Sequence, residues 1–422
     1  MNDFIARLLS NPDDISVYQE LHSISGNQWF LDLSSDLILE LLGIQDCYST
    51  GVEVISRSVS SVTSSYCKSI TFPNQHNLLC EFLLNSLNKQ DVLKPYFNAN
   101  TRKLPERKLL KIENATCICS PLSIAILDSE SKVVKEASHN ACEALYLWWL
   151  HSSQSINCKH LDTALFGSVQ QTFNLGHWFI DSLARLSYAL PLLEHLENLT
   201  VLVDTIDHKI IRDSLSFFGV NHFKPTLPYS VYKIETLYVP ILESFSDRVE
   251  IAATIVDQMY PIEKSLPNSS LGLVNPSQIY LSRQNLDRRK IINHDSVDAL
   301  LKKFNVSTVH PQELDLYTMN RLIKESQIVF GPNGAAMCNL LFASDSPTKV
   351  GILYPPTHLD DYYFLVSNAL SFNFYASFTH SCGNWSNLND MINSYYYPRV
   401  AEDYSVDSSF IFNMLSYITS LN

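Results

Sequence analysis

The chain has 422 residues, of which 46% are hydrophobic and 17% are charged. This length exceeds one typical folding core, so we expect two domains, and the composition excludes an intrinsically disordered chain. A formal net charge of −13 argues against nonspecific nucleic-acid binding, which needs a basic face.

The nine cysteines are irregularly spaced, and the one close pair, Cys117 and Cys119, has no second pair to complete a zinc site. We expect free, mostly buried thiols in a reducing compartment. The first residues lack a basic stretch followed by a long apolar core, and no run of eighteen apolar residues occurs. Neither a signal peptide nor a transmembrane helix is therefore predicted.

Residues 1–105 are expected to form a mainly helical N-terminal extension. Helical patterns begin near Asp14 and Ser34, and the second ends at Gly43 as a C-cap. Residues 46–75 are rich in Ser, Thr, Val and Tyr and are predicted to be extended, whereas the segment from Gln75 returns to helical periodicity. This part of the chain carries no recognisable chemistry.

Residues 106–245 alternate between strand and helix patterns. Strands are predicted at 108–119, 124–127, 165–169, 200–203 and 236–239, with helices at 139–151, 177–193 and 209–218. Such alternation is typical of a parallel, doubly wound α/β domain. We predict a Rossmann-like domain here.

A helix near 248–259 and a turn-rich stretch make residues 246–275 a predicted linker. A second Rossmann-like set follows in residues 276–380, and a helical tail is predicted for 381–422. The strands of this second Rossmann-like set are expected at 278–281, 307–310, 327–330 and 348–354. Two successive α/β sets imply two sheets facing one another across a cleft, where open α/β sheets bind ligands beyond the carboxyl ends of their strands.

Residues 328–342 combine a β-branched and aromatic run, a tight turn from Gly331 to Gly334 and a small-residue helix opening at Ala335. A strand, a glycine turn and a helix N-terminus present backbone N–H groups and the positive end of a helix dipole to an anion. The chain holds only 11 glycines, so two within four residues are a local concentration. An ordinary βα turn is the alternative interpretation.

His177, Asp181 and Arg185 recur at four-residue spacing, so on a helix they share one face. A histidine and a carboxylate near a helix start could deprotonate a hydroxyl nucleophile. Asp181 would be the base, or it would orient and charge-stabilise His177 as the base. The alternative is a purely structural His–Asp pair, because such pairs are common on helices.

A basic segment with Arg283, Arg288, Arg289 and Lys290 directly follows a predicted strand. An arginine at the carboxyl end of a parallel strand can bind a diphosphate through its guanidinium fork, whereas a solvated basic loop is the alternative. The chain lacks the phosphate-loop, dinucleotide and nucleophile-elbow motifs. It also lacks an Asp-x-Asp pair, so we predict neither a metal nor a cofactor.

Four short motifs follow one another along the chain. They are Asn174, His177, Trp178, Asp181, Leu183 and Arg185; the strand end Ser282–Arg283; Arg289, Ile291 and Asn293; and Gly331, Gly334, Ala335 and Asn339. In this order they resemble the motifs of the family 61 glycosyltransferases, over roughly Leu109 to Pro355. The chain departs from the family pattern at His294, which replaces Glu, at Ala336, which replaces Gly, and at Cys338, which replaces Thr.

The resemblance implies two Rossmann-like domains in the GT-B arrangement, a nucleotide-sugar donor, inversion at the anomeric carbon and no metal requirement. With the residue patterns, it gives Asp181 and His177 the catalytic role, supported by Asn174, Arg185 and Ser282. The donor would be bound by Arg283, Arg289, Asn293, Asn333, Gly334, Ala335 and Asn339. Arg283 and Arg289 would neutralise the leaving group, helped by the backbone N–H groups of the glycine turn.

We therefore expect an inverting, metal-independent glycosyltransferase that uses a glycan or lipid-linked glycan acceptor in bacterial capsule or lipopolysaccharide synthesis. It would be cytoplasmic, either free or peripherally associated with the inner membrane. Two alternatives stay open, because fold alone does not fix function. One is transfer of another group, such as a phosphosugar or pyruvyl group, and the other is a non-catalytic carbohydrate- or nucleotide-binding protein.

Overall fold

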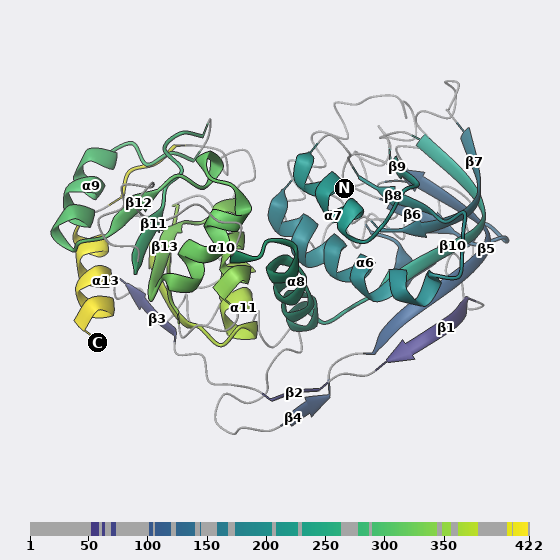
Figure 1. Cartoon of the computed structure of the whole chain (residues 1–422), viewed down its shortest axis with the longest axis horizontal. Helices are drawn as coiled ribbons and strands as arrows, with labels where there is room; N and C mark the ends of the chain where they lie inside the picture. Colours follow the sequence, from purple (N-terminus) through teal and green to yellow (C-terminus); the bar gives the residue numbers. More distant parts are fainter. Residues whose placement is uncertain are drawn as a thin grey trace, which may run out of the picture. The chain divides into compact units, whose positions relative to one another are not determined.

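The computed structural model describes residues 52–58, 61–63, 69–72, 101–103, 106–119, 124–139, 144, 158–167, 174–204, 208–226, 230–262, 277–286, 289–343, 348–355, 362–378, 403–406 and 408–420. The chain divides into two compact units (Figure 1). Unit 1 consists of Met1–Ser58 and Glu106–Glu243, and unit 2 of Val59–Pro105 and Ser244–Asn422. Within the described ranges, no helix is long and apolar enough to cross a membrane.

Unit 1 is built on a seven-stranded sheet with the order β1-β5-β10-β7-β8-β9, and β6 also pairs with β5. The strands are β1 (Glu53–Ser58), β5 (Arg107–Cys119), β6 (Ile124–Leu127), β7 (Cys158–Phe166), β8 (Thr200–Val203), β9 (Phe223–Pro225) and β10 (Ser230–Ile241). One hydrophobic cluster on this sheet includes Leu110, Ile112 and Tyr232, all almost fully buried.

The sheet of unit 1 is mixed, which corrects the prediction of a parallel domain. The strands β10, β7, β8 and β9 run parallel to one another, whereas β5 is antiparallel to β1, β6 and β10. Only residues 120–123 separate β5 from β6, and a connection this short joins antiparallel strands, since parallel strands need a long crossover. The strand pattern of β5 and β6 was predicted correctly, but its periodicity does not encode direction.

The helical segments of unit 1 are η1 (Lys135–Ala137), η2 (His177–Leu183), α6 (Ala184–Ala189), η3 (Leu190–Leu193) and α7 (Lys209–Phe217). The helix predicted at 177–193 is confirmed as one continuous helical run, but it opens as a π-helix, η2, and ends as a 3-10 helix. Turns of π-helix are rare and occur frequently at functional sites. The helix predicted at 139–151 lies almost entirely outside the described residues.

A buried tryptophan ties the π-helix to α7. Trp178 is fully buried, and its Nε1 donates a hydrogen bond to Ser214 Oγ at 3.1 Å. The Ser214 hydroxyl in turn donates to the Ile210 carbonyl at 2.7 Å. These hydrogen bonds satisfy the buried indole N–H. They also link the π-helix to α7.

Unit 2 contains a six-stranded sheet in which every neighbouring pair is parallel. Its order is β12 (Ser307–Val309), β11 (Gln278–Leu281), β13 (Ile328–Pro332), β14 (Lys349–Tyr354), β15 (Asn373–Phe378) and β3 (Ser69–Phe72). Numbered along the chain from β11, the first five strands follow the doubly wound order 2-1-3-4-5. The order reverses between β11 and β13, and ligands bind beyond the carboxyl ends of strands at such a switch point.

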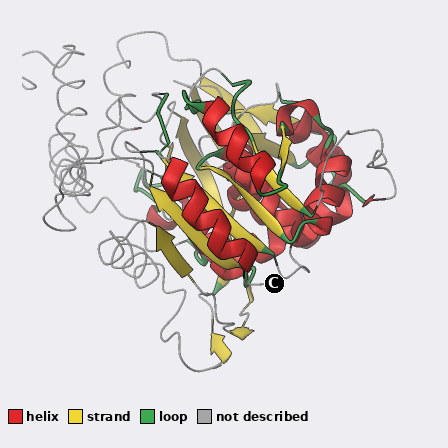
Figure 2. Ribbon diagram, turned by 90° about the vertical axis from the view of Figure 1, so that its left-hand side faces the viewer, coloured by secondary structure: helices red, strands yellow, loops and turns green. Residues whose placement is uncertain are grey.

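Helices cover both faces of this sheet (Figure 2). They are α8 (Phe245–Met259), α9 (His294–Lys303), η6 (Pro311–Glu313), α10 (Leu316–Glu325), η7 (Ala335–Ala343), α11 (Tyr362–Ala369) and α13 (Ser408–Ser420). A Cβ at Gly351 of β14 would contact Met414 of α13, and a Cβ at Gly331 of β13 would contact Met337 of η7. Because the register of the two strands turns these glycines to opposite sides of the sheet, α13 and η7 lie on opposite faces. The helix predicted from Ala335 is thus present, as a 3-10 helix.

The described part of residues 1–105 consists of strands. β1 forms one edge of the sheet in unit 1, β3 forms one edge of the sheet in unit 2, and β2 (Ser61–Thr63) pairs with β4 (Thr101–Lys103). The extended structure predicted for 46–75 is confirmed where it is described. The helices predicted before and after it lie outside the described residues. In the region predicted as a linker, α8 packs on η7 and α11 of unit 2.

The Trp178–Ser214 hydrogen bond predicts a stability effect. Ser214→Ala leaves the indole N–H buried without a partner, so we expect the free energy of unfolding to fall by about 1–3 kcal/mol. Chemical denaturation followed by tryptophan fluorescence measures this change. Ser216→Ala, at an exposed position on the same helix, is the matched control and should shift stability by less than about 0.5 kcal/mol. Equal stabilities of the two variants would contradict the assigned role of Ser214.

Candidate functional site

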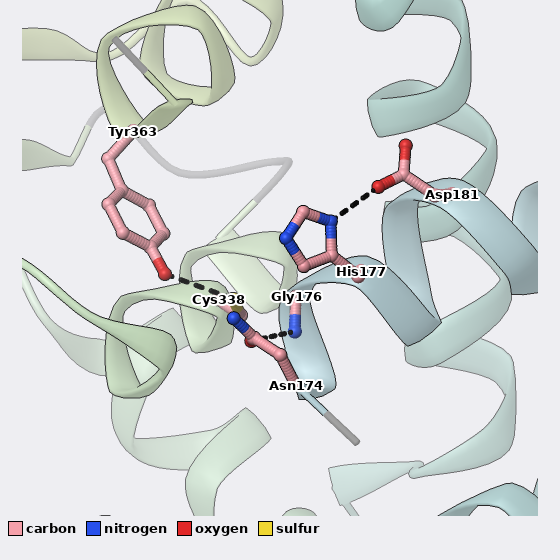
Figure 3. Close-up of polar contacts among 6 residues, drawn as sticks. All are labelled: Asn174, Gly176, His177, Asp181, Cys338 and Tyr363. Atoms are coloured by element: carbon pink, nitrogen blue, oxygen red, sulfur yellow. Dashed lines mark hydrogen bonds and ion pairs between the residues drawn. The ribbon is translucent and has the colours of Figure 1, made fainter. Parts of the chain in front are cut away.

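The π-helix of unit 1 brings His177 and Asp181 into direct contact. The two atoms His177 Nδ1 and Asp181 Oδ2 are 2.8 Å apart, as Figure 3 shows. The Asp181 side chain is 11% exposed and that of His177 is 31% exposed. A carboxylate that accepts from Nδ1–H selects the imidazole tautomer in which Nε2 carries no proton and can accept one. The structure thus brings the two predicted residues into the geometry that a base and its orienting carboxylate would have.

Asn174 and Arg185 flank this pair on the same segment. Asn174 begins the helical run, because its Oδ1 accepts from the Gly176 N–H at 3.1 Å and its carbonyl accepts from the Trp178 N–H at 3.0 Å (Figure 3). Such caps stabilise a helix start, so the structure gives Asn174 a local structural task. Arg185 is half-buried in α6, one turn beyond Asp181.

His139 is a further titratable residue near the pair that sequence reasoning missed. Its backbone exchanges two hydrogen bonds with Ile124, of 2.8 and 2.9 Å, which bring it back onto β6. Desolvation by the surrounding protein lowers the pKa of the His139 imidazole. The positive charge of Arg185 lowers this pKa further, whereas the negative charge of Asp181 raises it. No sequence signal marks His139, because its closeness to the π-helix comes from the β6 pairing.

In unit 2, Arg283 and Gly334 meet at the switch point of the parallel sheet. Arg283 follows β11 and is 5% exposed, and Gly334 follows β13. The guanidinium lies against the glycine so closely that a Cβ at Gly334 would approach Arg283 Cζ to 3.0 Å and Nη1 closer still. Only glycine allows this approach, and the φ of Gly334, 156°, is one that other residues rarely adopt.

The glycine turn itself is tightly held. Asn333 is buried, and its N–H donates to the Leu353 carbonyl at 2.9 Å, whereas the Gly334 carbonyl accepts from the Met337 N–H at 2.9 Å. Ala335 opens η7, and Asn339 Nδ2 donates to the Ala336 carbonyl within it at 2.8 Å. These contacts fix the backbone of the turn around Gly334.

Cys338 occupies a position where the family resemblance leads us to expect Thr. Its Sγ lies 3.2 Å from the hydroxyl of Tyr363 on α11, and both residues are buried (Figure 3). A thiol can take part in this contact as a weak donor or acceptor, as a hydroxyl would. The substitution therefore keeps a polar contact between η7 and α11.

A pocket of about 200 Å³ opens beside Arg283, at the carboxyl ends of β11 and β12. Tyr280, Ile291 and Val297 supply apolar walls. The polar side chains that line it are Ser282, Arg283, Gln284, Asn285, His294, Asp298, Thr308 and His310. Polar side chains thus outnumber the apolar ones in this pocket, and convergent polar groups are what orient a small-molecule ligand.

The polar groups of the pocket differ in their hydrogen bonding. Gln284 Nε2 and His294 Nδ1 lie 3.3 Å apart, and His310 Nδ1 is buried without a hydrogen-bond partner in the described part of the chain. Ser282 Oγ accepts from the Gln284 N–H at 3.2 Å, which holds the turn that carries Arg283. Sequence reasoning identified Ser282 and Arg283 here, but it assigned no role to the adjacent Gln284. It missed Asp298 and His310 because they are separated from Arg283 along the chain.

Arg289 and Asn293 lie on the loop that leads from β11 to α9. Arg289 is half-buried and adopts a left-handed backbone conformation, with φ 57°. Asn293 uses its amide group on the backbone of Val406, donating to the carbonyl at 2.7 Å and accepting from the N–H at 2.9 Å. The structure thus gives Asn293 a local task, and its predicted donor contact stays a prediction. Arg288 is outside the described residues.

The predicted residues therefore form two local groups, one on the π-helix of unit 1 and one at the switch point of unit 2. Across the described ranges of the chain, no group of three or more His, Cys, Asp and Glu side chains is placed to hold a metal ion. None of the four described cysteines, Cys117, Cys119, Cys158 and Cys338, forms a disulfide, and Cys158 alone among them is exposed.

Comparison with known proteins identifies the class. Residues 175–351 match the sequence model of the family described as Glycosyltransferase 61. No curated protein matches the chain. The matched range contains the His177–Asp181 pair, Arg283 and the glycine turn, and it ends within β14. Residues 175–351 are thus identified as a glycosyltransferase family 61 domain, and this domain supports a glycosyltransferase activity for the protein.

Proposed function

We propose that the protein transfers a sugar from a nucleotide-sugar donor to a hydroxyl of a glycan or lipid-linked glycan, with inversion at the anomeric carbon and without a metal ion. The observation that carries this proposal is the buried contact of Arg283 with Gly334 at the switch point of a parallel sheet. A guanidinium beside a glycine turn is suited to a diphosphate, because an arginine fork and backbone N–H groups can both donate to phosphate oxygens.

In this proposal unit 2 binds the donor. The diphosphate lies at Arg283 and the turn of Asn333, Gly334 and Ala335, and Arg289 adds a second positive charge. The nucleoside occupies the adjoining pocket, where Gln284, Asp298 and His310 offer hydrogen bonds and Tyr280 and Ile291 offer apolar walls. The free Nδ1 of His310 would gain a partner when a base or ribose enters.

Unit 1 supplies the base that activates the acceptor. His177 Nε2 takes the proton of the acceptor hydroxyl as its oxygen bonds to the anomeric carbon. The bond from that carbon to the diphosphate breaks, and its electron pair passes to the phosphate oxygen, whose charge Arg283 and Arg289 offset. Asp181 holds the tautomer of His177 and stabilises the imidazolium that forms. The greater burial of Asp181 favours His177 over Asp181 as the base.

The two units in this scheme are the acceptor and donor domains of a GT-B enzyme. Absence of an Asp-x-Asp pair in the sequence supports metal independence, because metal-dependent transferases of nucleotide sugars need carboxylates for the ion. The motif resemblance supports a role in bacterial capsule or lipopolysaccharide synthesis, in the cytoplasm or at the inner membrane. Analysis of the reaction product separates sugar transfer from transfer of a phosphosugar or pyruvyl group.

The dyad predicts a loss of turnover without a loss of donor binding. We expect His177→Gln to lower kcat by about 10²–10⁴-fold, the usual contribution of a general base, and Asp181→Asn to lower it through the wrong tautomer. Steady-state kinetics with the donor identified by binding measures this, and calorimetry should show an unchanged Kd for the nucleoside diphosphate. His160→Gln, at an exposed position on β7, is the control. If Asp181→Asn alone abolished turnover, Asp181 would be the base.

The Arg283–Gly334 contact predicts that both residues control donor affinity. Arg283→Lys keeps a charge but loses the guanidinium fork, and Gly334→Ala forces the fork away. We expect each to raise the Kd for the best of UDP, GDP, CDP and ADP by about 10–100-fold in calorimetry. Lys302→Ala removes an exposed cation of α9 and should leave the Kd unchanged. Wild-type affinity in both site variants would show that the diphosphate binds elsewhere.

Metal independence and inversion predict two further results. Activity of the enzyme should be the same with and without excess EDTA, because Arg283 and backbone N–H groups offset the charge of the leaving group. NMR of the product should show an anomeric configuration opposite to that of the donor sugar. Restoration of EDTA-treated enzyme by Mg²⁺ or Mn²⁺ would contradict the first expectation, and retention of configuration would contradict the single displacement.

A further inference from the structure

A short segment near the C-terminus pairs with the loop that carries the donor-site arginines. Tyr404 N–H donates to the Lys290 carbonyl at 2.9 Å, and Ile292 N–H donates to the Tyr404 carbonyl at 2.8 Å, so Tyr404 forms a parallel bridge with Ile291. Asp403 Oδ1 accepts from the Lys290 N–H at 2.8 Å. Together with the Asn293–Val406 pair, these bonds hold residues 403–406 against the loop that leads into α9.

The side chain of Tyr404 has an unmet hydrogen-bond requirement. Tyr404 is 5% exposed and belongs to the hydrophobic cluster that contains Tyr280 and Ile291, two residues that line the pocket. Its hydroxyl is buried and has no hydrogen-bond partner in the described part of the chain. Most buried hydroxyl groups have a partner, so one left without a partner beside two pocket-lining residues indicates a group that a ligand completes.

The charges around Tyr404 indicate which kind of ligand would complete it. Burial raises the pKa of the Tyr404 phenol well above its usual range, although the nearby guanidinium groups of Arg283 and Arg289 oppose that rise. The hydroxyl therefore keeps its proton at neutral pH. A protonated hydroxyl close to two guanidinium groups can donate to the same acceptor that they bind, and the acceptor that suits three such donors is an anion.

We infer that the Tyr404 hydroxyl donates a hydrogen bond to the diphosphate held by Arg283 and Arg289, so that residues 403–406 belong to the donor site. This inference rests on the proposed function, which places the diphosphate at Arg283. It extends the site beyond residues 175–351, the range that matches the family, to a segment that joins the site only in the folded protein.

The test is Tyr404→Phe in the full chain, with calorimetry against inorganic pyrophosphate and against UDP, GDP, CDP and ADP. Loss of one hydrogen bond to a charged ligand should raise the Kd for pyrophosphate and for the preferred nucleotide by at least about tenfold. The melting temperature of the unliganded variant should be unchanged or higher, because the substitution removes a buried hydroxyl without a partner. A purely structural tyrosine would not give this combination.

Tyr375→Phe is the matched control, because Tyr375 is buried in the same hydrophobic cluster but lies on β15, which β13 and β14 separate from β11 and its arginine. It should bind pyrophosphate and nucleotide as the wild-type protein does. Wild-type affinity in Tyr404→Phe, beside weakened binding in Arg283→Lys, would overturn this inference and leave the donor site intact. A folded wild-type protein that binds none of the probes would overturn the donor site and this inference together.

Discussion

The close approach of Arg283 to Gly334 is the constraint on which the arrangement of unit 2 depends. It requires β11 and β13 to be neighbours although β12 lies between them in sequence, and the 2-1-3-4-5 order supplies that adjacency. It also requires a residue without a side chain after β13, in a conformation that glycine tolerates. The parallel sheet thus places a buried cation and a set of backbone N–H groups at one edge, where neither element alone would concentrate them.

Unit 1 positions its reactive pair by a different device. A π-helix has a wider turn than an α-helix, and it is maintained here by burial on one side and by the Trp178–Ser214 hydrogen bond. The same turn pairs the half-buried His177 with the buried Asp181, next to the buried Trp178, Phe179 and Ile180. Stability and chemistry therefore share one short segment, because the residue that anchors it immediately follows the histidine that would act as the base.

Local patterns predicted most elements but not their directions or their distant partners. The strand patterns of β5, β10, β11 and β13 and the spacing of His177 and Asp181 depend on near neighbours, so the sequence reveals them. The antiparallel pairing of β5 depends on connection length and on register, which periodicity does not carry. The π-helical form of 177–183 depends on burial against α7, and the edge positions of β1 and β3 depend on sheets that form more than forty residues later.

The pocket and Tyr404 suggest why the proposed donor site extends beyond its motifs. Gln284, Asp298 and His310 converge because β11, α9 and β12 are packed side by side, and Tyr404 joins them because residues 403–406 continue the hydrogen bonding of the β11–α9 loop. Short motifs mark the residues proposed to bind phosphate, because the glycine turn and the arginine each occupy a short stretch of sequence. Residues proposed to contact the rest of the ligand are brought together by the fold, so they can lie far apart along the chain. A site defined by its motifs alone therefore omits the groups through which one transferase of this fold would select its own donor.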